Sequence, residues 1–440
     1  MIKQSCQNSR KRQGWLLLAL TLTCIGCDPF SADVPIPNLP KTLYVSAISS
    51  AINPNGTSRQ QAFASVQQAV HAAKDGDTIL IDINEQKPYQ ATNKQDAVIH
   101  IRNKRGLKLL GGRSMQDRPL DRSTLDGLQS FGNVLHVIRI DDSQDITITN
   151  FVVRKGKAQE GANEQDPDNW GAGILINNSK NIKLDNLLVT DNTAHWGAAV
   201  AVMNSLDVDL INCDLNNNRA QHRLIQQLPI GGKGGAIAVH NSQRVTITNT
   251  TVHNNSATNQ AGALYGQNCH MKLHNSIFEA NKAATTATGA FENLSGGAAF
   301  LYRCDCHIEN SNWTNNQAQQ AGALFADNTQ LTLVGGTFSN NTSRGNAAAV
   351  LAQNNSTVAV RNVQFNNNSA QQNGGALSIV SGSRAVVERS KFTSNNVKGA
   401  CPIILLSQEN GWQDGGRNVY QKNTDSGAAN NMAQGFFCKP

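Results

Sequence analysis

The 440-residue sequence has few charged and few aromatic residues. Asp, Glu, Lys and Arg make up 16% of the chain, and Phe, Trp and Tyr only 5%, which is low for a globular enzyme of this length. A chain of this composition cannot build its core around a few large rings, so it must bury many small aliphatic side chains in a regular way. The formal net charge is +7, but the basic residues are scattered and form no stripe interleaved with aromatics, which argues against a nucleic-acid partner.

The sequence also has no apolar run of the length that a comfortable membrane span needs, about 20 residues. The stretch WLLLALTLTCIGC follows three basic residues and ends in small ones, a pattern typical of an export signal. Its end, CIGC, resembles a bacterial lipobox in which Cys27 is lipidated, although Cys24 stands where such motifs usually carry Leu. Ordinary signal cleavage is the alternative. We predict a lipoprotein signal peptide at 1–26 and a Pro-spaced tether at 27–40.

Two short signatures alternate along the middle of the chain. One is a Gly/Ala pair followed by an aliphatic residue, such as GGAI at Gly234 and GGAL at Gly374. The other is a large apolar residue three positions before an Asn, such as Phe365 before Asn368. Each signature recurs eight times, with a basal period of about 26 residues. Self-similarity at such a period indicates a repeat architecture.

Apolar residues alternate with polar ones between the signatures, as at Val245 and Ile247. Pairs of this kind, three to a repeat and separated by Asn-rich corners, predict short strands rather than helices. Because about 26 residues are too many for one straight strand, each repeat must turn and form one coil of a solenoid. Asn suits the corners, since it tolerates left-handed backbone and can bond to the Asn of the next coil.

The alternation of GGA[I/L/V] with FxxN over residues 150–396 resembles the repeats of the polymorphic outer-membrane proteins of chlamydiae. The stretch from Tyr44 to Ile81 resembles the start of secreted pectin-lyase-like proteins. These resemblances imply an all-β fold, a right-handed parallel β-helix of about a dozen coils with an N-terminal capping helix. They also imply a cell-surface or envelope location.

The repeats divide the exported chain into three parts. We predict an N-terminal cap and the first coils at 41–130, with an amphipathic helix over Phe63–Ala73 that covers the open end of the solenoid. The repeat β-helix follows at 131–399. Residues 400–440 leave the repeat and are predicted to form a C-terminal cap.

Export to an oxidising compartment permits disulfides. Cys401 and Cys438 bracket the last segment, and we predict a bridge between them that holds the C-terminal cap. Cys269 and Cys304 occupy the same slot of adjacent repeats and are predicted to pair as well. The alternative for the second pair is that the thiols stay free, since neighbouring strands do not always present good disulfide geometry.

Three insertions, at 159–169, 221–231 and 284–295, interrupt the repeat at the same point of the coil. They therefore project from one edge, where insertions in a solenoid usually build a binding face. The outward positions of the strand beside this edge are predicted to bind a ligand: Tyr265, Phe300, Tyr302, Phe325, His240 and Asp327. One interpretation is an aromatic platform on which sugar rings stack. The alternative is that loops or the C-terminal tail bury this strip, because long exposed apolar patches are rare.

No catalytic signature is recognisable, so catalytic residues stay unassigned, and we expect neither a metal site nor a cofactor. We predict a lipid-anchored, monomeric, adhesin-like binding protein of the bacterial envelope that engages a polysaccharide or a cell-surface partner. The alternative, a polysaccharide lyase or glycoside hydrolase, rests on the pectin-lyase-like fold. A lyase would need a Lys or Arg base and a cluster of acidic side chains that binds Ca²⁺. The first insertion, together with Asp141 and Arg139 of an early coil, is the part of the sequence richest in such groups. A purely structural envelope protein is the third possibility.

Overall fold

The computed structural model describes residues 39–83, 87–91, 97–113, 122–129, 132–225, 228–284, 294–399, 401, 403–406, 411–425, 428–429 and 437–438. The predicted signal peptide, Cys27 and nearly all of the tether lie outside these residues. Residues 40–440 form one compact unit. In the ranges just given, no helix combines the length and the apolar character that crossing a membrane requires.

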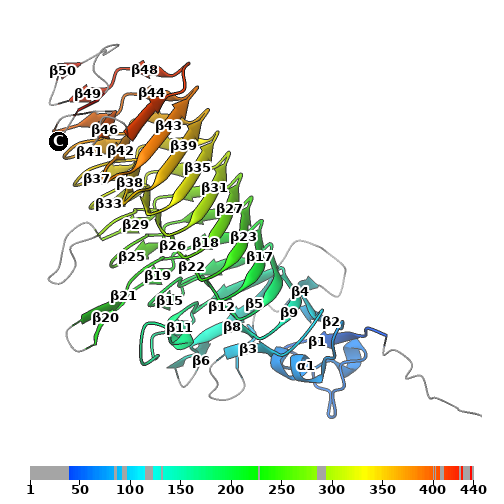
Figure 1. Ribbon diagram of the computed structural model, residues 1–440. Helices are drawn as coiled ribbons and strands as arrows, with labels where there is room; N and C mark the ends of the chain where they lie inside the picture. The colour runs from blue at the N-terminus through cyan, green and yellow to red at the C-terminus, as the bar shows by residue number, and fades with distance from the viewer. Residues whose placement is uncertain are drawn as a thin grey trace, which may run out of the picture. The chain divides into compact units, whose positions relative to one another are not determined.

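The unit is a right-handed parallel β-helix whose coils stack along one axis (Figure 1). A complete coil adds one strand to each of four parallel sheets, which we call sheets I to IV in the order that the chain meets them. One coil consists of β12 (Ile174–Asn177), β13 (Lys180–Asp185), β14 (Leu188–Thr190) and β15 (Thr193–Ala194). The prediction of a β-helix with about a dozen coils is confirmed, since the sheets hold 11 to 13 strands each.

Sheets I and II carry the longer strands. Sheet I contains β3 (Ala97–Arg102), β8 (His136–Asp141), β12, β16 (Val200–Met203), β22 (Ile237–His240), β26 (Leu264–Gln267), β30 (Ala299–Tyr302), β34 (Leu324–Asp327), β38 (Val350–Gln353), β42 (Leu377–Ile379), β46 (Ile404–Leu406) and β51 (Phe437–Cys438). Sheet II contains β1 (Thr42–Val45), β2 (Thr78–Asp82), β4 (Lys108–Arg113), β9 (Gln144–Thr149), β13, β17 (Leu206–Ile211), β23 (Gln243–Thr248), β27 (His270–His274), β31 (Asp305–Glu309), β35 (Gln330–Val334), β39 (Thr357–Arg361), β43 (Arg384–Glu388) and β47 (Trp412–Asp414).

Sheets III and IV consist of shorter strands. Sheet III contains β5 (Ser123–Asp126), β10 (Phe151–Arg154), β14, β18 (Asp214–Asn216), β24 (Thr251–His253), β28 (Ile277–Glu279), β32 (Asn312–Thr314), β36 (Thr337–Ser339), β40 (Gln364–Asn366), β44 (Lys391–Thr393) and β48 (Val419–Gln421). Sheet IV contains β11 (Lys157–Ala158), β15, β19 (Arg219–Ala220), β25 (Ser256–Ala257), β29 (Lys282–Ala283), β33 (Gln317–Ala318), β37 (Thr342–Ser343), β41 (Ser369–Ala370), β45 (Asn396–Val397) and β49 (Thr424–Asp425). The last strand of this sheet, β50 (Ala428–Ala429), pairs antiparallel with β49. Two hairpins stand outside the sheets, β6 (Leu128–Gln129) with β7 (Gly132–Asn133) and β20 (His222–Ile225) with β21 (Leu228–Gly231).

The expectation of three strands per coil was wrong, because each complete coil also contains a short fourth strand in sheet IV. After each FxxN corner, two further residues pair in register with the neighbouring coils, as Thr193 and Ala194 do with Arg219 and Ala220. Such a pair is too short for an apolar alternation to show in the sequence. The fourth strand therefore escaped prediction.

The glycines of the GGA signature are explained by the turn into sheet I. Gly234 has a φ of +68°, a left-handed conformation in which glycine is unstrained. At the next position, a Cβ on Gly235 would lie 2.1 Å from the carbonyl oxygen of Gly262 in the following coil. One glycine of the signature thus permits the turn and the other permits the close stacking of two backbones.

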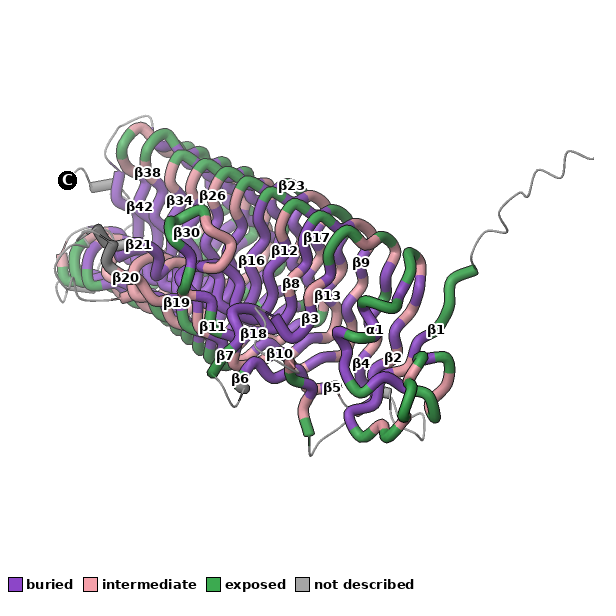
Figure 2. Tube along the Cα trace, turned by 90° about the horizontal axis from the view of Figure 1, so that it is seen from below, coloured by how far each residue is buried: buried purple, intermediate pink, exposed green. Residues whose placement is uncertain are grey.

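The interior of the solenoid is filled by stacked columns of aliphatic side chains. Figure 2 shows the buried stretches of the chain, in purple, recurring from coil to coil. In the C-terminal half, the apolar position of FxxN becomes a ladder of parallel rings. Adjacent ring centroids lie 4.2–5.7 Å apart in the series Phe278, Trp313, Phe338, Phe365, Phe392 and Tyr420. Offset stacking of this kind adds to the burial of the rings themselves.

A second internal column consists of the asparagines of FxxN. In each of these residues the side-chain Nδ2 donates to Oδ1 of the next, at 2.9–3.2 Å, and all are at most 2% exposed. The ladder runs through Asn192, Asn218, Asn255, Asn281, Asn316, Asn341, Asn368, Asn395 and Asn423. Because each amide also bonds to backbone groups, these buried polar side chains are satisfied and lock the register of the coils.

The N-terminal cap contains the predicted helix in shortened form. Helix α1 spans Val66–Ala72, with Ser65 at its N-cap, and buries Val66, Ala69 and Val70 against the first coils. Phe63 lies outside the helix but is 8% exposed and pairs with Val45 of β1. The 3₁₀ helix η1 (Arg59–Gln61) precedes it.

The cysteines follow the prediction as far as they are described. Cys269 and Cys304, at the starts of adjacent sheet II strands, form a disulfide. Cys401 is also disulfide-bonded. The side chain of Cys438, its predicted partner, lies outside the described residues, although the backbone of Cys438 pairs with Leu405 in sheet I.

Candidate functional site

The outer face of sheet I carries a second apolar cluster, separate from the interior of the solenoid. Its aromatic column is formed by Tyr265, Phe300 and Phe325, whose rings stack at centroid distances of 5.9 and 4.8 Å. These three side chains are only 4–6% exposed. The prediction that they form an open platform for sugar rings is therefore corrected: the rings are packed as a small outer core, as the alternative interpretation expected. Tyr302, beside them, stays half-buried.

A column that the sequence analysis missed runs along the edge of this cluster. The residues just before the Gly/Ala turn pair from coil to coil in the order Trp170, Trp196, Lys233 and Gln260. The indole rings of Trp170 and Trp196 stack at 5.0 Å with an interplanar angle of 8° and are 2–3% exposed. The signal was present in the sequence, since all four residues hold the same position in the repeat, immediately before the Gly/Ala signature.

Lys233 is the chemically unusual member of this column. Its Nζ lies 5.3 Å from the ring centroid of Tyr265, in a cation–π arrangement. Within the described part of the chain, Lys233 has no ion-pair partner and its ammonium has no hydrogen bond. Burial lowers the pKa of this lysine, and the charge of Glu164 in the first insertion opposes that shift only in part. The site therefore holds a partly desolvated cation without a direct counter-charge.

His240 lies on the same outer face, at the end of β22. Its ring centroid is 5.4 Å from that of Trp170, and its Nδ1 is buried without a hydrogen-bond partner among the described residues. Burial lowers the pKa of His240, although a hydrogen bond with Gln267 opposes the shift. Tyr265 donates its hydroxyl to Gln267 Oε1 at 3.1 Å. Lysine, histidine, amide and tyrosine side chains thus meet at one point of the insertion edge.

The polar positions of sheet I continue this row toward the C-terminus. Asp327 is half-buried and accepts hydrogen bonds from Gln353 Nε2 at 3.1 Å and from Asn354 Nδ2 at 2.8 Å. The guanidinium of Arg303 lies 4.8 Å from the ring centroid of Tyr302. Of the six predicted ligand-binding residues, His240, Tyr302 and Asp327 therefore remain accessible at least in part.

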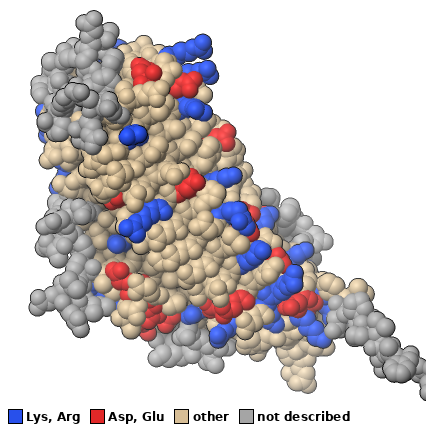
Figure 3. All heavy atoms as spheres, viewed as in Figure 1, with Lys and Arg blue, Asp and Glu red and all other residues tan. Residues whose placement is uncertain are grey.

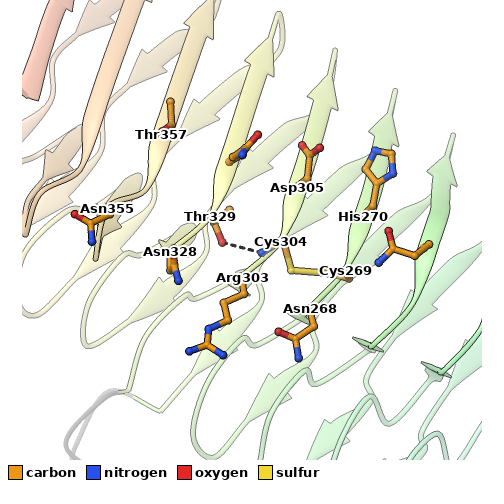
Figure 4. Close-up of a pocket in the computed structure, with 12 residues that line it drawn as sticks. Asn268, Cys269, His270, Arg303, Cys304, Asp305, Asn328, Thr329, Asn355 and Thr357 are labelled. Carbon is orange, nitrogen blue, oxygen red and sulfur yellow. Dashed lines mark hydrogen bonds between the residues drawn. A yellow bond between two sulfur atoms is a disulfide. The ribbon is translucent and has the colours of Figure 1, made fainter.

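A hollow of about 670 Å³ adjoins this row at the corner between sheets I and II (Figure 4). The disulfide of Cys269 and Cys304 forms its floor, and its walls are polar. Figure 4 shows the side chains of the lining residues Asn268, His270, Arg303, Asp305, Asn328, Asn355 and Thr357 on successive coils. Amides, a guanidinium and a carboxylate at this spacing can hydrogen-bond to a chain of hydroxyl groups laid along the coils.

The first two insertions form a wall beside the face. The β20–β21 hairpin packs against the first insertion, since Arg223 donates to the carbonyl oxygens of Gln159 and Gly161, and Gln159 bonds to Gln221 at 3.2 Å. Two of the three predicted insertions therefore lie side by side on one edge, as expected. Residues 285–293 of the third lie outside the described residues.

An ionic network occupies the N-terminal end of the same face. Asp141 on β8 accepts from His100 Nε2 at 2.8 Å, from Arg139 Nε at 2.6 Å and from Asn177 Nδ2 at 3.2 Å. Arg139 also donates to Asp168 of the first insertion at 3.0 Å. Burial alone would raise the pKa of Asp141, but the hydrogen bonds from His100 and Arg139 outweigh it and hold that pKa well below its usual range. The network fastens the insertion to the early coils.

This network predicts an acid-sensitive contribution to stability. A carboxylate whose folded pKa is depressed stabilises the fold above its unfolded pKa, near 4, and the contribution is lost as pH falls below that value. We expect Asp141→Asn to lower the free energy of unfolding by about 2 kcal/mol at pH 7 and to flatten its decline between pH 5 and 2. Denaturant titrations across this pH range measure both effects. Asp142→Asn, at a solvent-facing corner, is the matched control and should leave the decline intact; an identical decline in both variants would contradict the assignment.

Candidate metal-ligating side chains are spread over the coils. In the ranges that the structure describes, no three His, Cys, Asp or Glu side chains come together as metal ligands. His274 and Glu309, on the outer face of sheet II, approach to 3.4 Å as a simple surface pair. Figure 3 shows charged side chains scattered over the visible face rather than gathered in a stripe.

Comparison with known proteins agrees with the architecture. The fold and its repeats define a right-handed parallel β-helix protein: residues 133–294 match the family described as right handed beta helix region. Residues 362–379 match the Chlamydia polymorphic membrane protein repeat, as the signatures predicted. No curated protein matches the sequence.

Several solved structures resemble the chain at low sequence identity. A GH136 lacto-N-biosidase from Eubacterium ramulus is 12% identical over 87% of this chain and 68% of its own, with a TM-score of 0.51. The pectate lyase Pel9A (14%, 75% of each chain, TM-score 0.43) and PfbA, a surface adhesin of Streptococcus pneumoniae (12%, 87% of this chain and 90% of its own, TM-score 0.42), are more distant. At these identities the likeness extends to the fold and says nothing of activity.

Proposed function

We propose that the protein is exported, anchored by a lipid on Cys27 to a bacterial envelope membrane, and binds an acidic polysaccharide on the outer face of sheet I. The observation that carries the proposal is Lys233, a partly desolvated cation over the ring of Tyr265 with no counter-charge of its own. A sugar carboxylate or sulfate would supply the missing charge. Such a contact is strong because the site is shielded from water.

The rest of the face supports a chain-like ligand. Coils repeat at about 4.8 Å, so polar groups on successive coils form a regular row. Beyond Lys233, the row continues through Gln267, Tyr302 and Asp327 into the polar hollow at the corner. A polymer with hydroxyl groups along its length can use several of these positions at once, which raises affinity without any single strong contact.

The test is the affinity for polygalacturonate of residues 28–440, measured by calorimetry. We expect Lys233→Met to weaken binding at least tenfold, the effect of losing one charge-assisted contact of about 1.4 kcal/mol. The melting temperature should not fall, because methionine fills the same volume without a desolvated charge. Lys272→Met, on the exposed face of β27, removes the same charge elsewhere and should leave affinity within twofold. Equal affinities of the native protein and Lys233→Met would refute the proposed site.

A second candidate function, a polysaccharide lyase, is favoured by the same lysine. A lysine with a lowered pKa is neutral more often and can serve as a base. It would take the proton from the carbon beside the uronate carboxylate, and the electron pair would form a C=C bond. The C–O bond to the neighbouring sugar would break, and the leaving oxygen would take a proton from water to depart as a hydroxyl group. A rise in ultraviolet absorbance from unsaturated ends, lost in Lys233→Met, would establish this activity; a flat trace with tight binding would favour the binding protein.

A further inference from the structure

Within the unit of residues 40–440, the two most exposed apolar side chains of the described part belong to one loop near its N-terminal end. Ile48 and Ile52 are 69% and 93% exposed. The other large apolar side chains that face solvent are only 38–44% exposed and lie apart along the β-helix: Leu128, Ile277, Val386 and Val419. Single exposed apolar residues are ordinary on a protein surface, but a concentration of this kind marks an interaction site.

Ile48 and Ile52 belong to the loop of residues 46–58, which joins β1 to η1 and projects past α1 in Figure 1. No charged residue occurs between Lys41 and Arg59. The loop is nevertheless held in shape by hydrogen bonds. Ser49 Oγ donates to the carbonyl oxygen of Ala62 at 2.6 Å, and the Gly56 amide donates to that of Gln61 at 2.7 Å. The two isoleucines are therefore presented to solvent by an ordered loop.

The position of this loop in the chain indicates what covers it. Leu39, the first described residue, lies only twelve residues after Cys27, the candidate lipidation site. Fully extended, twelve residues reach about 40 Å. If Cys27 is anchored, the end of the solenoid that carries the loop stays within that distance of the bilayer. An uncharged loop with exposed isoleucines gains free energy by entering the boundary between lipid headgroups and acyl chains.

We propose that the loop of residues 46–58 inserts Ile48 and Ile52 into the surface of the membrane that carries the lipid anchor. The inference rests on the anchoring part of the proposed function. It gives the protein a second point of membrane contact, which orients the β-helix relative to the bilayer. The N-terminal cap then faces the bilayer, and the coils stack away from it toward the ligand.

The test replaces the lipid by a tag, so that its outcome does not depend on whether Cys27 is acylated. Residues 28–440 with an N-terminal hexahistidine tag are bound to phosphatidylcholine vesicles that contain a nickel-chelating lipid. Ile52→Trp places a fluorophore at the loop tip. Bromine atoms on the acyl chains quench only those indoles that reach them. We expect Ile52→Trp to add an emission that falls at least twofold on brominated vesicles, compared with the same protein on unbrominated ones.

Ile277→Trp, on β28 in the middle of sheet III, is the matched control and should show no quenching. An Ile52→Trp emission that bromine leaves unchanged, on protein shown to be vesicle-bound, would overturn the proposal. So would a dimer in sedimentation that Ile48→Ser with Ile52→Ser dissolves, because a second copy would then cover the loop. Acylation is checked separately, by incorporation of labelled palmitate into the native chain and not into Cys27→Ala, so failure of the anchor and failure of the loop are distinguishable.

Discussion

Replacing Asn316 by alanine should lower the free energy of unfolding by about 2–6 kcal/mol. Asn316 is fully buried in the middle of the asparagine ladder. Its Oδ1 accepts from the backbone amide of Asn281 at 3.0 Å and from the Asn281 side chain at 3.2 Å. Its Nδ2 donates to the carbonyl oxygen of Phe278 at 2.9 Å and to Asn341 at 3.0 Å. Alanine leaves two buried donors without acceptors, and each such loss costs about 1–3 kcal/mol.

Denaturant unfolding followed by circular dichroism measures this loss. Asn312→Ala is the control, because Asn312 is exposed on β32, four residues away. We expect the control to change the free energy of unfolding by less than about 0.5 kcal/mol. Equal small effects of the two substitutions would show that the ladder does not hold the coils in register.

Replacing Phe300 by serine should lower the free energy of unfolding by about 3–5 kcal/mol, the usual loss for deleting a buried ring. Phe300 is 6% exposed and stacks between Tyr265 and Phe325 in the outer cluster of sheet I. If the ring instead formed an open sugar platform, the substitution would remove ligand binding and leave stability nearly unchanged. The experiment therefore separates the two interpretations that the sequence left open.

Thermal and denaturant unfolding of Phe300→Ser measure the effect. Ile277→Ser is the control, since Ile277 is 38% exposed on an outer strand face and should lose far less. A melting temperature of Phe300→Ser within about two degrees of the native value would instead support the interpretation that the aromatic column is an open ligand platform.

The fold could be predicted because each coil of a solenoid repeats the same pattern of residue types along the sequence. Each FxxN signature marks an inward ring or aliphatic group and a buried ladder asparagine, and the corner asparagines at Asn186, Asn212 and Asn249 have the expected left-handed φ of 50–54°. The disulfide of Cys269 and Cys304 followed from the same register. Periodicity alone could not reveal the two-residue strands of sheet IV, which are shorter than any alternation.

The candidate site could be predicted only in part. The insertion edge and the outward positions of sheet I were correctly located, because register decides which face a side chain takes. Whether an outward ring is open or covered depends on neighbouring columns, and those contain residues outside the repeat signature. The position of Lys233 immediately before the Gly/Ala signature was readable from the sequence, but its lack of a counter-charge depends on its surroundings and becomes visible only in the structure.

The proposed function requires that this outer face recognises negative charge on a sugar polymer. The direct measurement compares the affinity of residues 28–440 for polygalacturonate with that for the same polymer after its carboxylates have been reduced to alcohols. If the proposed function is right, we expect saturable binding of the acidic form, weakened by salt, and at least tenfold weaker binding of the neutral form. Equal affinities for the two forms, or no binding of polygalacturonate, alginate or hyaluronan, would contradict it.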